Sequence, residues 1–377
     1  MMLRLWLRWT WRDLRGRWPQ VLATALVLSI GVGGFAGLRG LKEWREQSVS
    51  ASLTAARAHD LRVDLVDGAF VPQGALSAAL TPAPAGMAAA EERLVVNSQL
   101  EALSAGKPVF VPARLIGLPD RVGEQAVEAV TIKAPKGTAS PTRSDAILDW
   151  NFADYYDLPS RGTVRIAGLG PTRYVGVGVS PQYFLIVDDA GVAGAQSRLA
   201  VVYLPLTSAQ KAAGKERKVN GIVIGAVPGA NLPALEREVR RALEETLPNT
   251  GFTVTRGDEE PVTRSLLRDA RSDQKLYTVF ALLLLAGAAL AAFNLVSRVV
   301  DAQRREIGIG MSLGAEPRML AIRPLALGLQ IGLLGVLLGV PVGIGLGELI
   351  RSLLRATLPL PEFWELPTDV HQHLNRA

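Results

Sequence analysis

Residues 304–315 read Arg-Arg-Glu-Ile-Gly-Ile-Gly-Met-Ser-Leu-Gly-Ala. They lie in a charged connector, residues 298–323, between two uncharged segments, residues 276–297 and 324–347. Each uncharged segment is long enough to cross the hydrocarbon layer of a membrane, which takes roughly 20 helical residues. The pattern therefore assigns the chain to the α-helical membrane proteins and predicts a short loop at a membrane face.

The connector carries signals for the end of one helix and the start of another. Gly314 is placed to adopt the left-handed conformation that ends a helix, so the preceding span should continue as far as Leu313. Pro317 suits the first turn of the next helix. Narrow apolar stripes also lie beside basic side chains, which predicts a docking surface. The stripes are Ile309 with Leu313 and Ile307 with Met311, beside Arg304, Arg305 and Arg318.

A third uncharged segment, residues 21–38, follows a basic, tryptophan-rich segment, residues 1–20. The basic segment is predicted to be an amphipathic helix at the lipid headgroups. A cleaved signal peptide is the alternative, but the small-residue pattern near Ala36 and Gly37 is poor, which favours an uncleaved anchor. Arginines in residues 1–20 and in the connector place both on the cytoplasmic side.

The long region between the first two spans, residues 39–275, is predicted to be an extracytoplasmic α+β domain. The first span should continue outward as a stalk helix to about Arg57, and a second stalk should run from Pro261 into the membrane without a break. Between the stalks, the order strand, helix, strand is expected twice. These elements are Leu61–Val66, Gly74–Leu80 and Arg93–Leu100, then Val219–Val227, Leu232–Leu247 and Phe252–Thr255.

Residues 108–205 interrupt this repeat and are predicted to form a mostly β insertion, because they are rich in Gly, Pro and β-branched runs. The expected strands are Val109–Ile116, Val127–Ile132, Thr163–Ala167, Arg173–Val179 and Ala200–Leu204.

Glycines recur at four-residue intervals in the third span, so that a neighbouring helix can approach closely. They are Gly335, Gly339, Gly343 and Gly347. Pro341 is expected to kink this helix. Glu348 and Arg351 belong to a predicted extracytoplasmic tail of residues 348–377. They are interpreted as side chains at the membrane interface, and a proton or substrate site is the alternative.

The run Arg305-Glu306-Ile307-Gly308, followed by Leu313-Gly314-Ala315 and a glycine-rich apolar helix, resembles the signature of FtsX-like permeases, the MacB-type membrane subunits of ABC transporters. The resemblance implies that this segment contacts a separate ATPase and that the exterior domain has two lobes, one interrupting the other. The implied ATPase-coupling residues are Arg304, Arg305, Glu306, Ile307, Gly308, Leu313, Gly314 and Ala315. The family's basic unit has four spans and three are visible here, which implies a second permease chain or a missing C-terminal half as a partner.

Composition narrows the function classes. The net charge of +6 is modest and the basic residues gather beside apolar segments, which favours membrane lipid over nucleic acid as a partner. The sequence has no phosphate-binding P-loop, so any ATP must be bound by a partner subunit, and no cofactor is expected. The sequence holds no cysteine, and His59, His371 and His373 form no metal-ligand pattern.

We therefore expect a nonenzymatic, multi-pass permease subunit of the inner (cytoplasmic) membrane. It would couple ATP hydrolysis on a partner to motion of the exterior domain, for export or extraction of lipids, lipoproteins, peptides or amphiphilic compounds. The alternative is an FtsX-like signalling protein that regulates a cell-wall hydrolase without transport. A third possibility is a plain membrane anchor whose exterior domain binds a ligand. The sequence leaves the substrate, the ATPase and the oligomeric state open.

Overall fold

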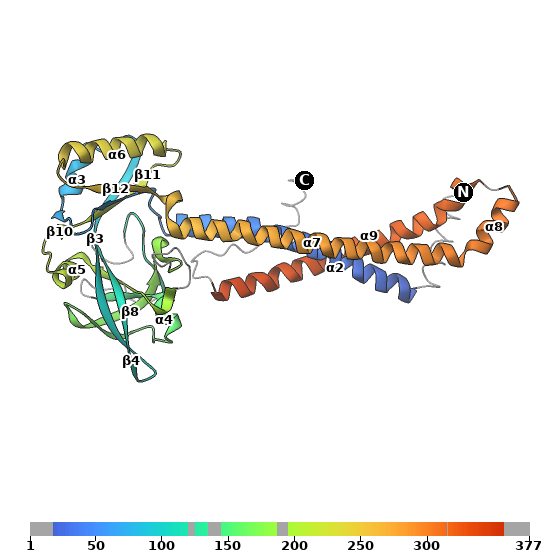
Figure 1. Cartoon of the computed structure of the whole chain (residues 1–377), viewed down its shortest axis with the longest axis horizontal. Helices are drawn as coiled ribbons and strands as arrows, with labels where there is room; N and C mark the ends of the chain where they lie inside the picture. Colours follow the sequence, from blue (N-terminus) through green and yellow to red (C-terminus); the bar gives the residue numbers. More distant parts are fainter. Residues whose placement is uncertain (1–17, 120–124, 135–144, 187–194, 315, 358–377) are drawn as a thin grey trace. The chain divides into compact units, whose positions relative to one another are not determined.

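The computed structural model describes residues 18–119, 125–134, 145–186, 195–314 and 316–357 (Figure 1). The predicted N-terminal amphipathic segment up to residue 17 and the tail from residue 358 lie outside these ranges. The chain divides into two compact units. One, the helical unit, holds residues 1–46 and 269–356; the other, the domain, is built mainly from residues 47–268.

Long helices make up the helical unit within the described residues. They are α2 (Trp18–Ala55), α7 (Pro261–Ala302) and α9 (Pro317–Thr357), with the short α8 (Arg304–Ser312) between the last two. Three helical stretches are long and apolar enough to cross a membrane, namely Trp18–Leu38, Lys275–Ala302 and Leu320–Leu353. The three predicted apolar helices are thus present, each longer than its uncharged core. The third continues through residue 348 to Thr357, so the start of the predicted tail is helical.

Both predicted stalks are confirmed as helices. α2 continues beyond its apolar part to Ala55, and α7 begins at Pro261 and runs unbroken into its apolar part. Within the domain, the last turns of α2 and the first turns of α7 share an apolar cluster. Its buried members are Val49, Ala56, Val262 and Leu266, together with Val179 and Phe184.

The domain is built on a ten-stranded sheet, counted over the described residues, in the order β12-β1-β11-β3-β4-β9-β6-β8-β5, with β7 paired to β3 and β8. A small second sheet pairs β2 (Val71–Pro72) with β10 (Lys218–Val219).

The first lobe of the domain confirms the predicted strand–helix–strand repeat. Its strands are β1 (Leu61–Leu65), the first part of β3 (Met87–Ser104), β11 (Gly221–Ala226) and β12 (Phe252–Arg256). Helices α3 (Ala75–Ala79) and α6 (Leu232–Thr246) pack against this part of the sheet (Figure 1).

Helix α6 shows why its sequence folds this way. The side chain of Asn231 caps its first turn by accepting a hydrogen bond from the Ala234 backbone N–H at 3.1 Å. Leu235, Val239 and Leu243 recur at four-residue intervals, and all are buried against the sheet.

The second lobe is the mostly β insertion. It contains β4 (Lys107–Leu118), β5 (Thr131–Ala134), β6 (Ala146–Asp149), β7 (Gly162–Ile166), β8 (Gly170–Val179) and β9 (Ala200–Pro205). Helices α4 (Trp150–Tyr155) and α5 (Leu206–Ala213) were not predicted, nor was β6.

One strand prediction in this lobe is wrong over most of its length. The sequence predicts that Val127–Ile132 is extended, but β5 begins only at Thr131. The residues before it are held by a different contact, because the backbone N–H of Ala129 donates to the Ala56 oxygen at 2.8 Å. Tertiary context here overrides the β propensity of Val127 and Val130.

Strand β3 belongs to both lobes. Residues 87–93 pair with β11, whereas residues 94–104 pair with β4 (Figure 1). One continuous apolar core accompanies this sharing, and it joins side chains of α6 and β11 to side chains of β4, β6 and β9.

Candidate functional site

The connector between α7 and α9 is a short helix followed by a left-handed turn. α8 ends at Ser312, and Gly314 has a φ of 84°. The predicted helix stop at Gly314 and helix start at Pro317 are confirmed. The predicted continuation of α7 into this segment is wrong, because the chain turns at Gln303, whose backbone N–H bonds to the Val300 oxygen at 3.1 Å.

Large apolar side chains of this connector are exposed. Ile309 and Met311 are about half exposed, and Leu313 is 82% exposed. Gly310 lies against the following helix, since a methyl group added there would come within 3.0 Å of a Leu320 side-chain carbon. The connector therefore presents apolar surface of the kind that marks a protein contact.

The other implied coupling residues lie around this surface. Arg304 and Arg305 are exposed, and Arg304 forms an ion pair with Asp301 at 3.2 Å. Ile307 is half-buried, and Gly308 has open space around its α-carbon. The side chain of Glu306 and the whole of Ala315 lie outside the described part of the chain.

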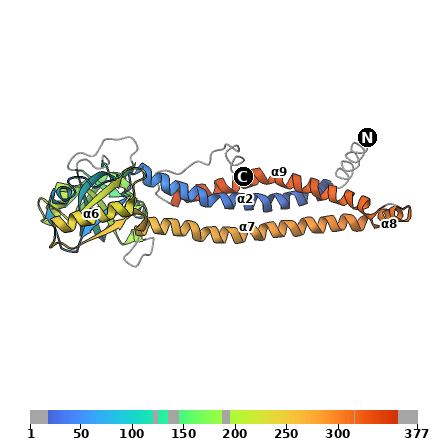
Figure 2. The same ribbon diagram turned by 90° about the horizontal axis from the view of Figure 1, so that it is seen from above.

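The glycine face of α9 packs against α2, and Figure 2 shows these two helices side by side. A methyl group added at Gly335 would lie 2.6 Å from Leu28 Cβ, and one added at Gly343 would lie 2.8 Å from the Gly33 backbone oxygen. At Gly339 the corresponding distance to the Ser29 oxygen is 3.3 Å. The helix backbones therefore approach closely along this seam, which we define by Gly335, Gly339 and Gly343.

Helix α2 contributes glycines of its own, which sequence reasoning missed. A methyl group at Gly37 would lie 2.7 Å from the Gly343 oxygen, so Gly37 extends the seam. Gly31 faces α7 instead, with the Leu284 oxygen 3.0 Å away from an added methyl group. Glycines on two faces of α2 therefore let two helices approach its backbone closely.

Two further predictions for α9 concern Gly347 and the kink at Pro341, and the kink stays a prediction. Among the side chains that the structure describes, the one that a methyl group added at Gly347 would meet is Arg351 of the same helix, at 3.7 Å, so no described contact places Gly347 in the seam. Pro341 lies inside a helix that continues on both sides of it, and Pro324 is a second internal proline.

Arg351 is buried against neighbouring side chains, and its place at the membrane interface stays a prediction. Only 2% of the residue is exposed, its Nη1 lies 2.9 Å from a Glu348 carboxylate oxygen, and its guanidinium lies 5.8 Å from the ring centre of Trp44 on α2.

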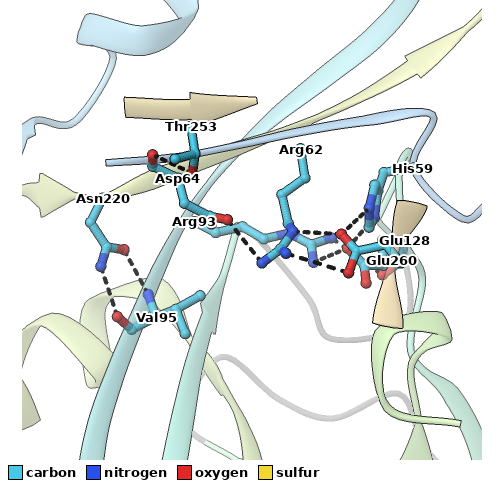
Figure 3. A network of polar contacts seen from close by, with 9 residues as sticks. All are labelled: His59, Arg62, Asp64, Arg93, Val95, Glu128, Asn220, Thr253 and Glu260. Atoms are coloured by element: carbon cyan, nitrogen blue, oxygen red, sulfur yellow. Dashed lines mark hydrogen bonds and ion pairs between the residues drawn. The ribbon is translucent and has the colours of Figure 1, made fainter. Parts of the chain in front are cut away.

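A buried ionic cluster lies in the domain, where α2 ends and α7 begins (Figure 3). We call it the ionic joint: His59, Arg62, Arg93, Glu128 and Glu260. His59 Nδ1 lies 3.1 Å from Glu128 Oε2, and His59 Nε2 lies 3.1 Å from Glu260 Oε1. Arg93 Nη1 approaches Glu128 Oε2 at 2.6 Å, and Arg62 Nε approaches Glu260 Oε1 at 2.8 Å.

The backbone around the joint is tied to the end of α2. Arg57 and Glu128 both have positive φ, 50° and 56°, which non-glycine residues rarely adopt. The Arg57 side chain donates to the Gln125 oxygen at 2.7 Å. Strained conformations of this kind persist only where surrounding contacts hold them.

The contacts set the protonation of the joint. Burial lowers the pKa of His59, but the charge and hydrogen bond of Glu128, with those of Glu260, outweigh it and raise the pKa to about 9. Burial raises the pKa of Glu128, but Arg93 and His59 outweigh it and lower the pKa to about 2. Burial also raises the pKa of Glu260, and His59 and Arg62 bring it below its ordinary value. Near neutral pH, His59 is therefore protonated and both Glu128 and Glu260 are carboxylates.

A cavity of about 440 Å³ borders the joint. His59 and Glu260 form part of its wall. The other lining residues include Pro181, Leu53 of α2 and Thr263 of α7.

Comparison with known proteins identifies the region that holds the connector and the seam. Residues 278–368 match the FtsX-like permease C-terminal family. The resemblance drawn from the connector sequence is thereby confirmed. A curated relative, the macrolide export ATP-binding/permease protein MacB of Sodalis glossinidius (strain morsitans), is 25% identical over 202 residues. That alignment covers 51% of this chain and 29% of the relative.

Solved structures similar to this chain include the periplasmic region of MacB from Actinobacillus actinomycetemcomitans, with 13% identity and a TM-score of 0.38. It covers 56% of this chain and 94% of that one. The extracellular domain of the ABC-type transporter YknZ from Gram-positive bacteria has 11% identity and a TM-score of 0.36, and covers 52% and 98% of the two chains.

The residues matched to the FtsX-like family include some of the candidate sites and not others. It contains α8, the exposed Leu313 and the α9 side of the seam, whereas the ionic joint lies before it. Sequence reasoning missed the joint because Glu128 and Glu260 lie 69 and 201 residues from His59 along the chain. The one local signal is that His59 follows the first stalk and Glu260 precedes the second.

Proposed function

We propose that this chain is the membrane subunit of an ABC transporter of the FtsX-like, MacB type. One observation carries the proposal: the FtsX-like match includes a connector with exposed apolar side chains between two helices long enough to span a membrane. In a permease, such a connector is where an ATPase can bind.

The three apolar helices would cross the cytoplasmic membrane, with the connector inside and the domain of residues 47–268 outside. The arginines of the connector and of the first residues support this orientation, since basic residues gather on the cytoplasmic side of short loops. Membrane lipid is then a partner along all three helices.

An ABC ATPase on a separate chain would supply the energy, and the permease itself would catalyse no reaction. The relative from Sodalis combines ATP binding and permease in its name, and this chain covers 29% of its length. The 377 residues contain no P-loop, so ATP would be bound outside them. A second permease chain, or a further permease segment, would complete the membrane part.

The transporter would export or extract lipids, lipoproteins, peptides or amphiphilic compounds. The relative is named for export, and this favours transport over the alternative of signalling to a cell-wall hydrolase.

The connector can be tested by changing Leu313, which is exposed and lies just beyond the last residue of α8. With the partner ATPase present, Leu313→Glu should abolish the stimulation of ATP turnover, because a carboxylate cannot be buried in an apolar contact. Membrane insertion should stay unchanged. Turnover of the purified complex in detergent is the measurement.

Leu313→Met is the matched control, since it keeps an apolar side chain of similar volume and should keep the stimulation. Unchanged stimulation in Leu313→Glu, with the complex intact, would remove the connector from the mechanism.

A further inference from the structure

The ionic joint lies between two helices that continue into apolar, span-length segments. His59 comes four residues after Ala55, the last residue of α2, and Glu260 comes directly before Pro261, the first residue of α7. The contact between His59 and Glu260 therefore links the end of one long helix to the start of the other.

The geometry requires a charged imidazole. A neutral histidine has one N–H, yet each ring nitrogen here faces a carboxylate oxygen at 3.1 Å. Two carboxylate acceptors are satisfied only when both nitrogens donate, that is, by imidazolium. Charge balance agrees, because His59, Arg62 and Arg93 face Glu128, Glu260 and Asp64, with Asp64 paired to Arg62 at 2.9 Å.

His59 joins the two halves of the cluster in Figure 3. Arg93 binds Glu128 and thereby ties it to β3, whereas Arg62 binds Glu260 and ties it to β1. Without the imidazolium, each carboxylate keeps one cation, but the two ion pairs belong to different strands. His59 is therefore the bridging group.

We propose that His59 is the positioning residue that fixes the end of α2 to the start of α7, so that displacement of one helix is passed to the other helix and to strands β1 and β3 of the domain. This inference rests on the proposed function, because it assigns the place where motion of the membrane helices enters the domain.

Apolar packing alone would not fix the end of α2 to the start of α7. Val49, Ala56, Val262 and Leu266 keep the two helices in contact, but apolar contact is non-directional and tolerates sliding. Charged hydrogen bonds are directional and short, so they fix the spacing and the rotation of the helix ends. The positive φ values of Arg57 and Glu128 show that the chain adopts strained backbone to place these groups.

The chain contains no cysteine, so a pair of introduced cysteines can be labelled without background. Ala55→Cys and Arg264→Cys place spin labels on exposed positions of α2 and α7. The distance distribution between the labels is measured by double electron–electron resonance on the full-length chain in detergent. It is compared among the parent, His59→Gln, His59→Lys and Glu260→Gln.

His59→Gln is neutral and should broaden the distribution and shift it to longer distance. His59→Lys keeps the charge and several donors, and should restore the parent distribution. Glu260→Gln removes the charge on the α7 side and should broaden the distribution as His59→Gln does.

Asn220→Ala is the matched control for general loosening. Asn220 exchanges two 2.8 Å hydrogen bonds with the Val95 backbone inside the domain, and Figure 3 shows it apart from His59 and Glu260. Loss of the Asn220 side-chain amide should lower the melting temperature of the protein and leave the distance between the two spin labels unchanged. A parent-like distribution in His59→Gln, or equal broadening in Asn220→Ala, would overturn the proposal.

The measurement needs no ATPase. If the Leu313 variants show that the connector does not couple to an ATPase, the label distances still decide whether His59 holds the helix ends.

Discussion

At the scale of the residue, opposite charges replace the lost hydration of several buried charged side chains. Glu128 is fully buried, and His59 and Arg93 both bind its carboxylate. Arg351 is nearly as buried, and Glu348 and the ring of Trp44 surround its guanidinium. In such clusters, deleting one partner costs about 3–5 kcal/mol because the remaining charge stays buried and unpaired.

The bridge at His59 should make stability depend on pH. Its pKa is about 9 in the folded chain against an ordinary 6.5, so the folded state binds the proton more tightly. The stability it adds is fully present below pH 6.5 and is lost as the pH rises through 9. The free energy of unfolding of the native chain should exceed that of His59→Gln by on the order of 2 kcal/mol at about pH 6 and by little at about pH 10.

Thermal unfolding of both chains across this pH range is the measurement. Asp149, whose pKa burial raises to about 7, also lowers stability as the pH rises, but it does so equally in both chains and cancels in the difference. A difference that stays constant across the whole range would show that folding leaves the pKa of His59 unchanged and would contradict the charged bridge.

At the scale of the element, the long helices and the repeated strand–helix–strand order could be predicted because their periodicity is strong. The turn at Gln303 could not, since residues 300–304 contain no glycine or proline to mark it. The glycine face of α9 was visible in the sequence, but its partner was not. The glycine face of α9 packs against α2 because Gly33 and Gly37 of α2 allow close approach. The spacing of glycines along α9 alone does not reveal which helix packs against them.

The seam yields a paired prediction. A methyl group at Gly343 would lie 2.8 Å from a backbone oxygen, whereas one at Gly345 would have no atom of the described residues within 4 Å. Gly343→Ala should therefore push α2 and α9 apart and destabilise the helical unit by about 1–3 kcal/mol. Gly345→Ala, two residues away on the same helix, should be neutral or slightly stabilising. The melting temperature in detergent distinguishes them, and equal values would mean that the seam is loosely packed.

At the scale of the whole molecule, the domain includes the helix ends. The sequence alone predicts that a fragment of about residues 57–258 folds by itself. The structure shows that such a fragment lacks Glu260 and the apolar contacts of Val49, Val262 and Leu266. The joint could not be foreseen because its members come together only in the fold.

Two fragments test this. Residues 47–268 should give a monodisperse protein with a higher melting temperature than residues 57–258, because the shorter fragment leaves His59 with one carboxylate partner. Size-exclusion chromatography and circular dichroism are the measurements. Equal melting temperatures would mean that the helix ends add nothing to the domain.

The sharing of β3 has a thermodynamic consequence. Residues 87–93 of this strand complete the sheet of one lobe and residues 94–104 that of the other, with no break in the chain between them. If either lobe unfolds, the part of β3 in that lobe loses its strand pairing, and the other lobe loses hydrogen-bond partners and core contacts. The two lobes should therefore melt cooperatively, in one calorimetric transition whose van't Hoff and calorimetric enthalpies agree.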